Sequence, residues 1–205
     1  MAHVPTPNTV RVCLRYTQNG QQTCNVFHVD VGVDPTESTL RDVADVFKLW
    51  WDTDMQTAVT AGTTLDAVEV VDVSADDQEG IVDTTGLPLN GTHIGANMPN
   101  NVTLCVKLAT GLTGRSRRGR KYIVGIPDSV IEGPGQEVTP AYRDAIKAIF
   151  ESLLANLATA GFQWVVNSTV TGGIERLTGL NTPITDIAVD DTLDSMRRRL
   201  PGRGS

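Results

Sequence analysis

The side chains best suited to chemistry in this chain are arginines and lysines gathered in two short stretches. Nine of the seventeen basic residues lie within residues 115–121 and 197–203, although the protein carries a net charge of −7. Guanidinium and ammonium groups bind phosphate and carboxylate oxygens, and crowded like charges need a partner of opposite sign. We therefore predict a binding role for both stretches. The residues concerned are Arg115, Arg117, Arg118, Arg120, Lys121, Arg197, Arg198, Arg199 and Arg203.

One acidic pattern has the spacing of a metal site. Asp190, Asp191 and Asp194 match the DDxxD magnesium motif of isoprenoid synthases. Those enzymes are all-helical, whereas this pattern follows a predicted strand, so the structural context of the motif is missing. Asp194 also lies at ion-pair spacing from Arg197 and Arg198. We predict no metal site here.

The remaining candidates for catalysis are scattered. His3, His28 and His93 are far apart in the sequence, and none has an acidic residue or cysteine beside it. Catalytic and metal-binding histidines need such partners within hydrogen-bonding reach. No glycine-rich nucleotide-binding loop is present either. The sequence thus predicts a protein that is not an enzyme and has no cofactor and no small-molecule substrate.

The charge changes sign along the chain. Residues 1–100 contain 14 acidic and 4 basic residues, whereas residues 101–205 contain 10 acidic and 13 basic residues. Such polarity favours head-to-tail contact between identical subunits. The alternative is that one face of the protein is acidic and solvated, with no partner.

The cysteines and the N-terminus suggest a cellular compartment. Cys13, Cys24 and Cys105 lie in strand-like apolar surroundings without zinc or redox spacing, which predicts buried free thiols made in a reducing cytosol. Cys13 is expected opposite Val26 in a hairpin, with Cys24 on the diagonal and no disulfide between them. The first residues do not resemble a signal peptide, and no apolar run is long enough to span a membrane.

Hydrophobic periodicity predicts a single α+β domain over residues 1–205. We expect a mostly antiparallel sheet with two long amphipathic helices packed on it, because a hairpin–helix–strand order occurs twice. A basic loop at 110–121 and an extended C-terminal arm at 197–205 complete this picture. The predicted strands are 9–17, 23–31, 65–73, 101–109, 121–126, 162–168 and 184–189; the predicted helices begin near residues 35 and 140, and a long loop covers 74–100.

Two adjacent tryptophans lie in the first predicted helix. Neighbouring residues point about 100° apart on a helix, so Trp50 and Trp51 cannot share one line of the core. One alternative is that one of them reaches a subunit interface, where tryptophan is enriched. The other is that both are buried in a broad apolar stripe.

Several stretches together resemble small virion structural proteins of phages and metagenomic viruses. They are residues 110–120 (TGLTGRSRRGR), residues 189–204, the strand around Asn25–His28 and the Trp50–Trp51 helix. The resemblance implies a multimeric, non-enzymatic role. We therefore expect a coat or capsid subunit that assembles in many copies, with the basic loop and the C-terminal arm contacting neighbours or packaged nucleic acid.

This expectation has alternatives and consequences. A neck or tail component of the virion is one alternative, and a free nucleic-acid-binding module is another. The sequence pI of about 4.9 argues against the second, because dedicated nucleic-acid binders are usually basic overall. The expected partners are other copies of the chain and packaged viral nucleic acid, without a membrane. The expected location is the virion, after synthesis in the host cytoplasm.

Overall fold

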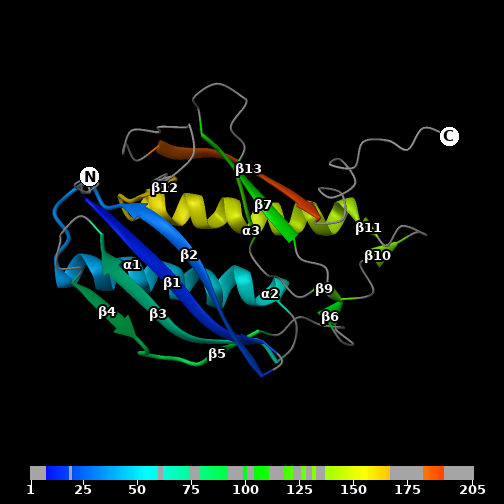
Figure 1. Cartoon of the computed structure of the whole chain (residues 1–205), viewed down its shortest axis with the longest axis horizontal. Helices are drawn as coiled ribbons and strands as arrows, with labels where there is room; N and C mark the ends of the chain where they lie inside the picture. Colours follow the sequence, from blue (N-terminus) through cyan, green and yellow to red (C-terminus); the bar gives the residue numbers. More distant parts are fainter. Residues whose placement is uncertain are drawn as a thin grey trace, which may run out of the picture.

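A computed structural model shows one large antiparallel sheet packed against two helices (Figure 1). The structure describes residues 8–18, 20–59, 62–73, 79–91, 99–100, 104–110, 118–121, 126–127, 131–132, 137–166 and 182–191. The α+β class predicted from the sequence is confirmed, and so is the antiparallel character of the sheet.

The sheet is built around an N-terminal hairpin. β1 (Thr9–Gln18) pairs with β2 (Gln21–Asp30), and Cys13 lies opposite Val26 as predicted. Gly20 in the turn has φ of 76°, a conformation that glycine adopts without steric cost. Alternate residues of β1 (Val10, Val12, Leu14 and Tyr16) face the helices and are buried. The period of two therefore fixes which face of the hairpin meets the core.

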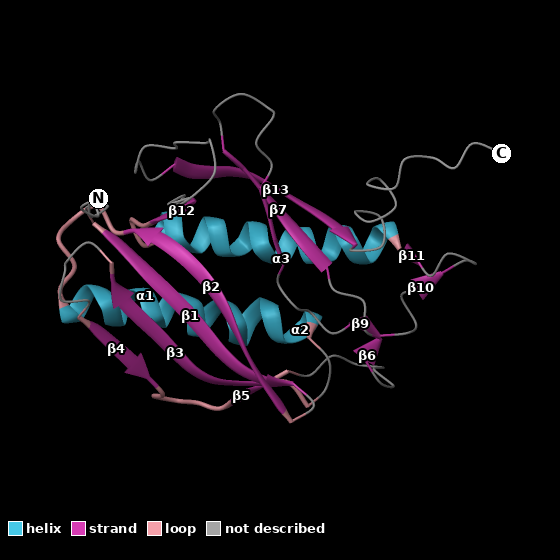
Figure 2. Ribbon diagram, viewed as in Figure 1, coloured by secondary structure: helices cyan, strands magenta, loops and turns pink. Residues whose placement is uncertain are grey.

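Further strands extend the hairpin on both sides. β3 (Thr64–Asp72) pairs with β1, and both β4 (Gly80–Asp83) and β5 (Leu89–Asn90) pair with β3. On the other side β12 (Gln163–Val166) pairs with β2 and is followed by β13 (Thr182–Asp191), β7 (Leu104–Thr110) and β8 (Arg118–Lys121). The nine-stranded sheet has the order β4-β3-β1-β2-β12-β13-β7-β8, with β5 beside β3. Figure 2 shows these strands in magenta.

Four very short strands form two separate ribbons. β6 (Pro99–Asn100) pairs with β9 (Ile126–Pro127), and β10 (Ile131–Glu132) pairs with β11 (Glu137–Val138). The sequence predicted a loop at 74–100, whereas β4, β5 and β6 lie there. Strands of two to four residues are too short to show an alternating pattern, so this part of the prediction was wrong.

The two main helices begin at side-chain caps. α1 (Glu37–Trp50) starts after Thr36, whose hydroxyl accepts a hydrogen bond from the Thr39 amide. It continues through a π-helical turn, η1 (Trp51–Met55), into α2 (Gln56–Ala58). α3 (Pro140–Thr159) starts after Thr139 in the same way, and proline occupies its first position. Capping threonines and an initial proline satisfy or remove the amides that a helix start leaves unpaired.

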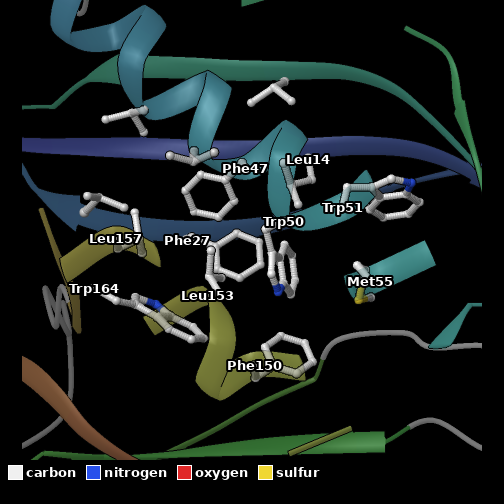
Figure 3. Packing of buried hydrophobic residues seen from close by; sticks show 14 of the residues in the cluster. Leu14, Phe27, Phe47, Trp50, Trp51, Met55, Phe150, Leu153, Leu157 and Trp164 are labelled. Carbon is white, nitrogen blue, oxygen red and sulfur yellow. The ribbon is translucent and has the colours of Figure 1, made fainter. Parts of the chain in front are cut away.

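A cluster of aromatic rings joins the helices to the sheet (Figure 3). Phe27 of β2 lies 5.0 Å from the ring of Phe47 and 5.5 Å from that of Trp164, measured between centroids. Trp50 of α1 packs edge-on against Phe150 of α3 at 5.4 Å, and its Nε1 donates a hydrogen bond of 2.8 Å to the Ile149 carbonyl. The packing of α1 on α3 therefore depends on one side chain that contributes both apolar area and a polar contact.

Both tryptophans of the first helix are fully buried within the chain. Trp50 points toward α3, whereas Trp51 lies 5.7 Å from the ring of Tyr16 on β1. The two rings therefore pack against different elements, α3 and β1, on either side of the point where the α-helix changes to the π-helical turn. Neither ring is exposed for contact with another subunit. Of the two alternatives, burial of both tryptophans is therefore correct, and an interface role is not.

The cysteine prediction needs correction. Cys13 and Cys24 form a disulfide, with Cα atoms 5.9 Å apart. The two residues are diagonal in the hairpin register, as predicted, and they share one face of the sheet. The twist of the sheet brings one diagonal pair closer than a flat ribbon does, into the range that a disulfide needs. The expectation of free thiols at these positions was wrong, and the inference of a reducing cytosol loses its basis.

We predict one reactive thiol in the unfolded, non-reduced protein. Protein purified without reductant and denatured in excess maleimide should gain one adduct, at Cys105, because the other two cysteines are bonded to each other. After reduction it should gain three. Intact mass spectrometry measures both values, and three adducts before reduction would contradict the disulfide.

A second prediction concerns the aromatic cluster. Trp50→Ala should lower the free energy of unfolding by about 3–5 kcal/mol, because it removes a buried ring and leaves a cavity. Leu49→Ala is the matched control: its side chain is 57% exposed on the same helix, and its effect should stay within about 0.5 kcal/mol. Urea denaturation measures both values, and equal losses would show that Trp50 has no special role.

Candidate functional site

The best candidate for a functional site is the pair of sheet edges, because the predicted basic residues lie at one of them. Arg118, Arg120 and Lys121 belong to β8, the last strand on that side of the sheet. They therefore lie on a strand, and the prediction that all of 110–121 forms a loop was wrong. Arg115 and Arg117 fall outside the described residues, as do Arg197, Arg198, Arg199 and Arg203.

The basic edge contains no compensating acid in its own sequence. Residues 101–121 include six basic residues and no aspartate or glutamate. The neighbouring strand β7 contributes Lys107, which is opposite Gly119 in the register. The hairpin β7–β8 is therefore basic, and the nearest described acidic residues of the sheet lie on β13, the strand on the other side of β7, at Asp186, Asp190 and Asp191.

The opposite edge of the sheet is acidic. β4 ends the sheet there, with Glu79 exposed beside it. Helix α1 packs against β3 and β4 at the same end, as Figures 1 and 2 show. Residues 34–54, which include α1 and all of η1 except Met55, contain six acidic and two basic residues. The sign change seen along the sequence thus corresponds to two opposite edges of one sheet.

A partly buried ion pair fixes β4 to α1. The Lys48 ammonium lies 2.8 Å from Asp83 Oδ2 and 2.7 Å from Asp45 Oδ1. The Asp83 side chain is 5% exposed, whereas that of Asp45 is 68% exposed. Asp83 also accepts a hydrogen bond from the Thr85 amide at 2.8 Å. This contact holds the short edge strand against the helix.

The pair shifts the pKa of both groups. Burial alone raises the pKa of Asp83, but the hydrogen bonds from Lys48 and Thr85 outweigh it and the pKa is lowered. Burial alone lowers the pKa of Lys48, but the hydrogen bonds to Asp45 and Asp83 outweigh it and the pKa is raised. Both shifts favour the charged forms, so the ion pair persists at neutral pH.

The backbone of β4 leaves hydrogen-bonding groups at the free edge. The Asp72 amide donates to the Glu79 carbonyl at 2.8 Å, and Val71 lies opposite Gly80. Backbone groups alternate in direction along an antiparallel pair. Ile81 and Asp83 therefore direct their backbone groups to β3, whereas Gly80 and Val82 direct theirs away from the sheet.

Side chains at this edge allow another strand to approach. Val82 is 63% exposed, which makes it one of three large hydrophobic residues exposed in the described part of the chain. A Cβ atom at Gly80 would lie 2.9 Å from the Val70 carbonyl oxygen, so only glycine fits there. β4 lies within the segment predicted to be a loop, so this edge was not predicted; the apolar pair Ile81–Val82 between Gly80 and Asp83 was its one local signal in the sequence.

Described residues line hollows at two places where a helix meets the sheet. The larger, about 400 Å³, lies between the start of α1 and β4 and is acidic, with Glu37, Asp72 and Glu79 in its lining. The smaller, about 230 Å³, lies between α3 and the ends of β12 and β13, with an apolar lining that includes Leu154 and Trp164.

The described residues contain no cluster of three or more histidine, cysteine, aspartate or glutamate side chains able to hold a metal ion. Within the same residues, no helix is long and apolar enough to cross a membrane. Comparison with protein-family models, curated proteins and solved structures found no match to this chain.

The ion pair leads to a pH-dependent prediction. Asp83→Asn should lower the free energy of unfolding at pH 7 by about 1–3 kcal/mol, because it leaves Lys48 with only an exposed partner. The Asp83 pKa is lowered on folding, so its contribution is present above the unfolded value near 4 and is lost as the pH falls through the folded value. The difference between the two proteins should therefore shrink in acid.

The matched control is Asp45→Asn, which removes the other, exposed carboxylate from the same lysine. Its effect should stay below about 1 kcal/mol, as for surface ion pairs. Chemical denaturation at pH 7 and pH 3 measures both variants. Equal effects of the two substitutions, or a loss at Asp83 that does not change with pH, would contradict this account.

Proposed function

We propose that this protein is a structural subunit that assembles in many copies, and that the assembly is a viral coat. The observation that carries the proposal is the opposite charge of the sequences at the two ends of the described sheet, β8 and β4. Opposite charges on opposite sides of a subunit favour ordered contact between copies. The resemblance of residues 110–120 and 189–204 to virion proteins supports the viral part of the proposal.

The basic residues have a second expected partner in a coat. Arg197, Arg198, Arg199 and Arg203 belong to a sequence with Pro201 and Gly202, which cannot continue a helix. In the proposed assembly this arm contacts neighbouring subunits or packaged nucleic acid. Phosphate binding by arginine requires no particular base sequence, so it suits the packaging of a whole genome.

The size of the purified protein tests the proposal. Light scattering should show a particle far heavier than the 22.0 kDa chain, and the ratio of absorbance at 260 nm to 280 nm should show whether nucleic acid is enclosed. A large particle is the result expected for a coat. An empty ring of a few copies would instead indicate a neck or tail component.

A chain that stays monomeric over a wide concentration range would contradict the proposal. A monomer that binds nucleic acid, with an affinity that falls steeply with added salt, would instead indicate a free nucleic-acid-binding module. The two results separate the classes, because assembly between protein edges does not need nucleic acid.

A further inference from the structure

We propose that β8 of one copy pairs with β4 of the next copy, antiparallel, so that the sheet continues from subunit to subunit. This inference rests on the proposed function, since it names the surface through which copies assemble. Its occupant is a second copy of this chain. Four observations support it: strand direction, backbone groups directed away from the described sheet, charge, and a similar junction within the chain.

Strand direction permits this junction without turning the neighbour over. Every adjacent pair along the path from β4 to β8 is antiparallel. Directions therefore alternate, and β4 and β8 run opposite to each other. When a second copy in the same orientation is placed beside the first, its β4 lies antiparallel to β8. The two strands have the same length, four residues each.

The backbone supplies the bonds for such pairing. Gly80 and Val82 direct their N–H and C=O groups away from β3, toward the place where the neighbour's β8 would lie. Strand β8 likewise pairs with β7 on one side and ends the path of the described sheet on the other. An edge of this kind is a template for another strand unless it is blocked. Gly80 has no side chain to interfere at the β4 edge.

Charge selects this pairing over two alternatives. Pairing of β8 with β8 brings Arg118, Arg120 and Lys121 against their own copies, and like charges directly opposite each other are destabilising. Pairing of β4 with β4 brings together two acidic edges with Glu79 exposed on each. Only pairing of β8 with β4 places cations next to anions. The contact is therefore heterologous, and copies join head to tail.

The chain already contains one junction of this kind. β2 is the second strand of the hairpin β1–β2, and β8 is the second strand of the hairpin β7–β8. In each case the first hairpin strand pairs on its other side with a longer strand, β1 with β3 and β7 with β13, and that strand pairs in turn with a four-residue strand, β3 with β4 and β13 with β12. β2 is then covered by β12, through three residue pairs. β8 has the position of β2, and no described strand covers it.

The size of the contact predicts how assembly behaves. Four residue pairs bury much less than the roughly 1,200–2,000 Å² of a stable pairwise complex. A single β4–β8 contact is therefore weak. A closed ring of copies is more stable than an open row, because each copy then makes two contacts. Because part of the proposed attraction is between opposite charges, added salt should weaken it.

The first test removes one edge amide. Val82→Pro deletes an N–H that points away from β3 and leaves the bonds of Ile81 and Asp83 to β3 in place, which edge strands tolerate. The concentration at which half of the protein is assembled should rise roughly tenfold, because each contact loses about one hydrogen bond. Val82→Thr keeps the amide and is the matched control; its value should stay within about twofold.

The second test exchanges the charges. One variant, Arg118→Glu with Arg120→Glu, has two acidic edges; another, Glu79→Lys with Val82→Lys, has two basic edges. Each alone should fail to assemble, because like edges meet. An equal mixture should assemble. The acidic β8 of the first variant then meets the basic β4 of the second, and the basic β8 of the second meets the acidic β4 of the first. Light scattering and electron microscopy measure the assembly of each variant and of the mixture. Circular dichroism shows whether each variant is folded.

The outcomes separate this inference from the proposed function. If the unmodified protein assembles and both Val82→Pro and the unmixed charge variants assemble equally well, the edge pairing is wrong and the proposed function stands. If the mixture fails to recover assembly, the edge pairing is also wrong. If the unmodified protein does not assemble at any concentration, the proposed function and this inference both fail.

Discussion

An open antiparallel sheet ends in two edge strands whose outward backbone groups have no partner within the sheet. Most of the described strands of this protein form such a sheet, with β4 at one edge and β8 at the other, and the proposed assembly depends on these two edges. The residues near the two edges differ in sign: six basic residues and no acidic one in 101–121, and an excess of acidic residues in 34–54. The proposal that copies join through these edges follows from the need to satisfy both the backbone and the charge.

The rest of the fold makes the two edges parts of one rigid body. Trp50 joins α1 to α3 through its ring contact with Phe150 and its hydrogen bond to Ile149. Tyr142 Oη of α3 donates to the Ala58 carbonyl at 3.0 Å, and Ser152 Oγ lies 2.8 Å from Asp54 Oδ2. These contacts tie the helix beneath β4 to the helix beneath β12 and β13. In the proposed assembly, each subunit must hold its two edge strands in a fixed relative position, and these contacts contribute to that.

The sequence predicts long elements with clear periodicity and misses short ones. The hairpin register, with Cys13 opposite Val26, follows from the Asn19–Gly20 turn signal, and the start of α3 follows from Thr139 and Pro140. The strand β4 has only four residues, and its stability comes from Lys48, which is 35 residues away in the sequence. The Cys13–Cys24 disulfide depends on sheet twist, which a flat register does not contain. Basic residues of the candidate site were identified from the sequence, but their place at a sheet edge required the topology.

Hydrogen exchange of the unmodified protein tests the central claim most directly. The amides of Gly80 and Val82, and those of 118–121 that point away from β7, should exchange more slowly in the assembled protein than in the dilute, dissociated protein, because strand pairing protects outward edge amides. Amides in the centre of β1 should exchange at similar rates in both states, since they are already paired on both sides. Equal exchange of both edge strands in the two states, in a protein shown to assemble, would contradict pairing of β4 with β8.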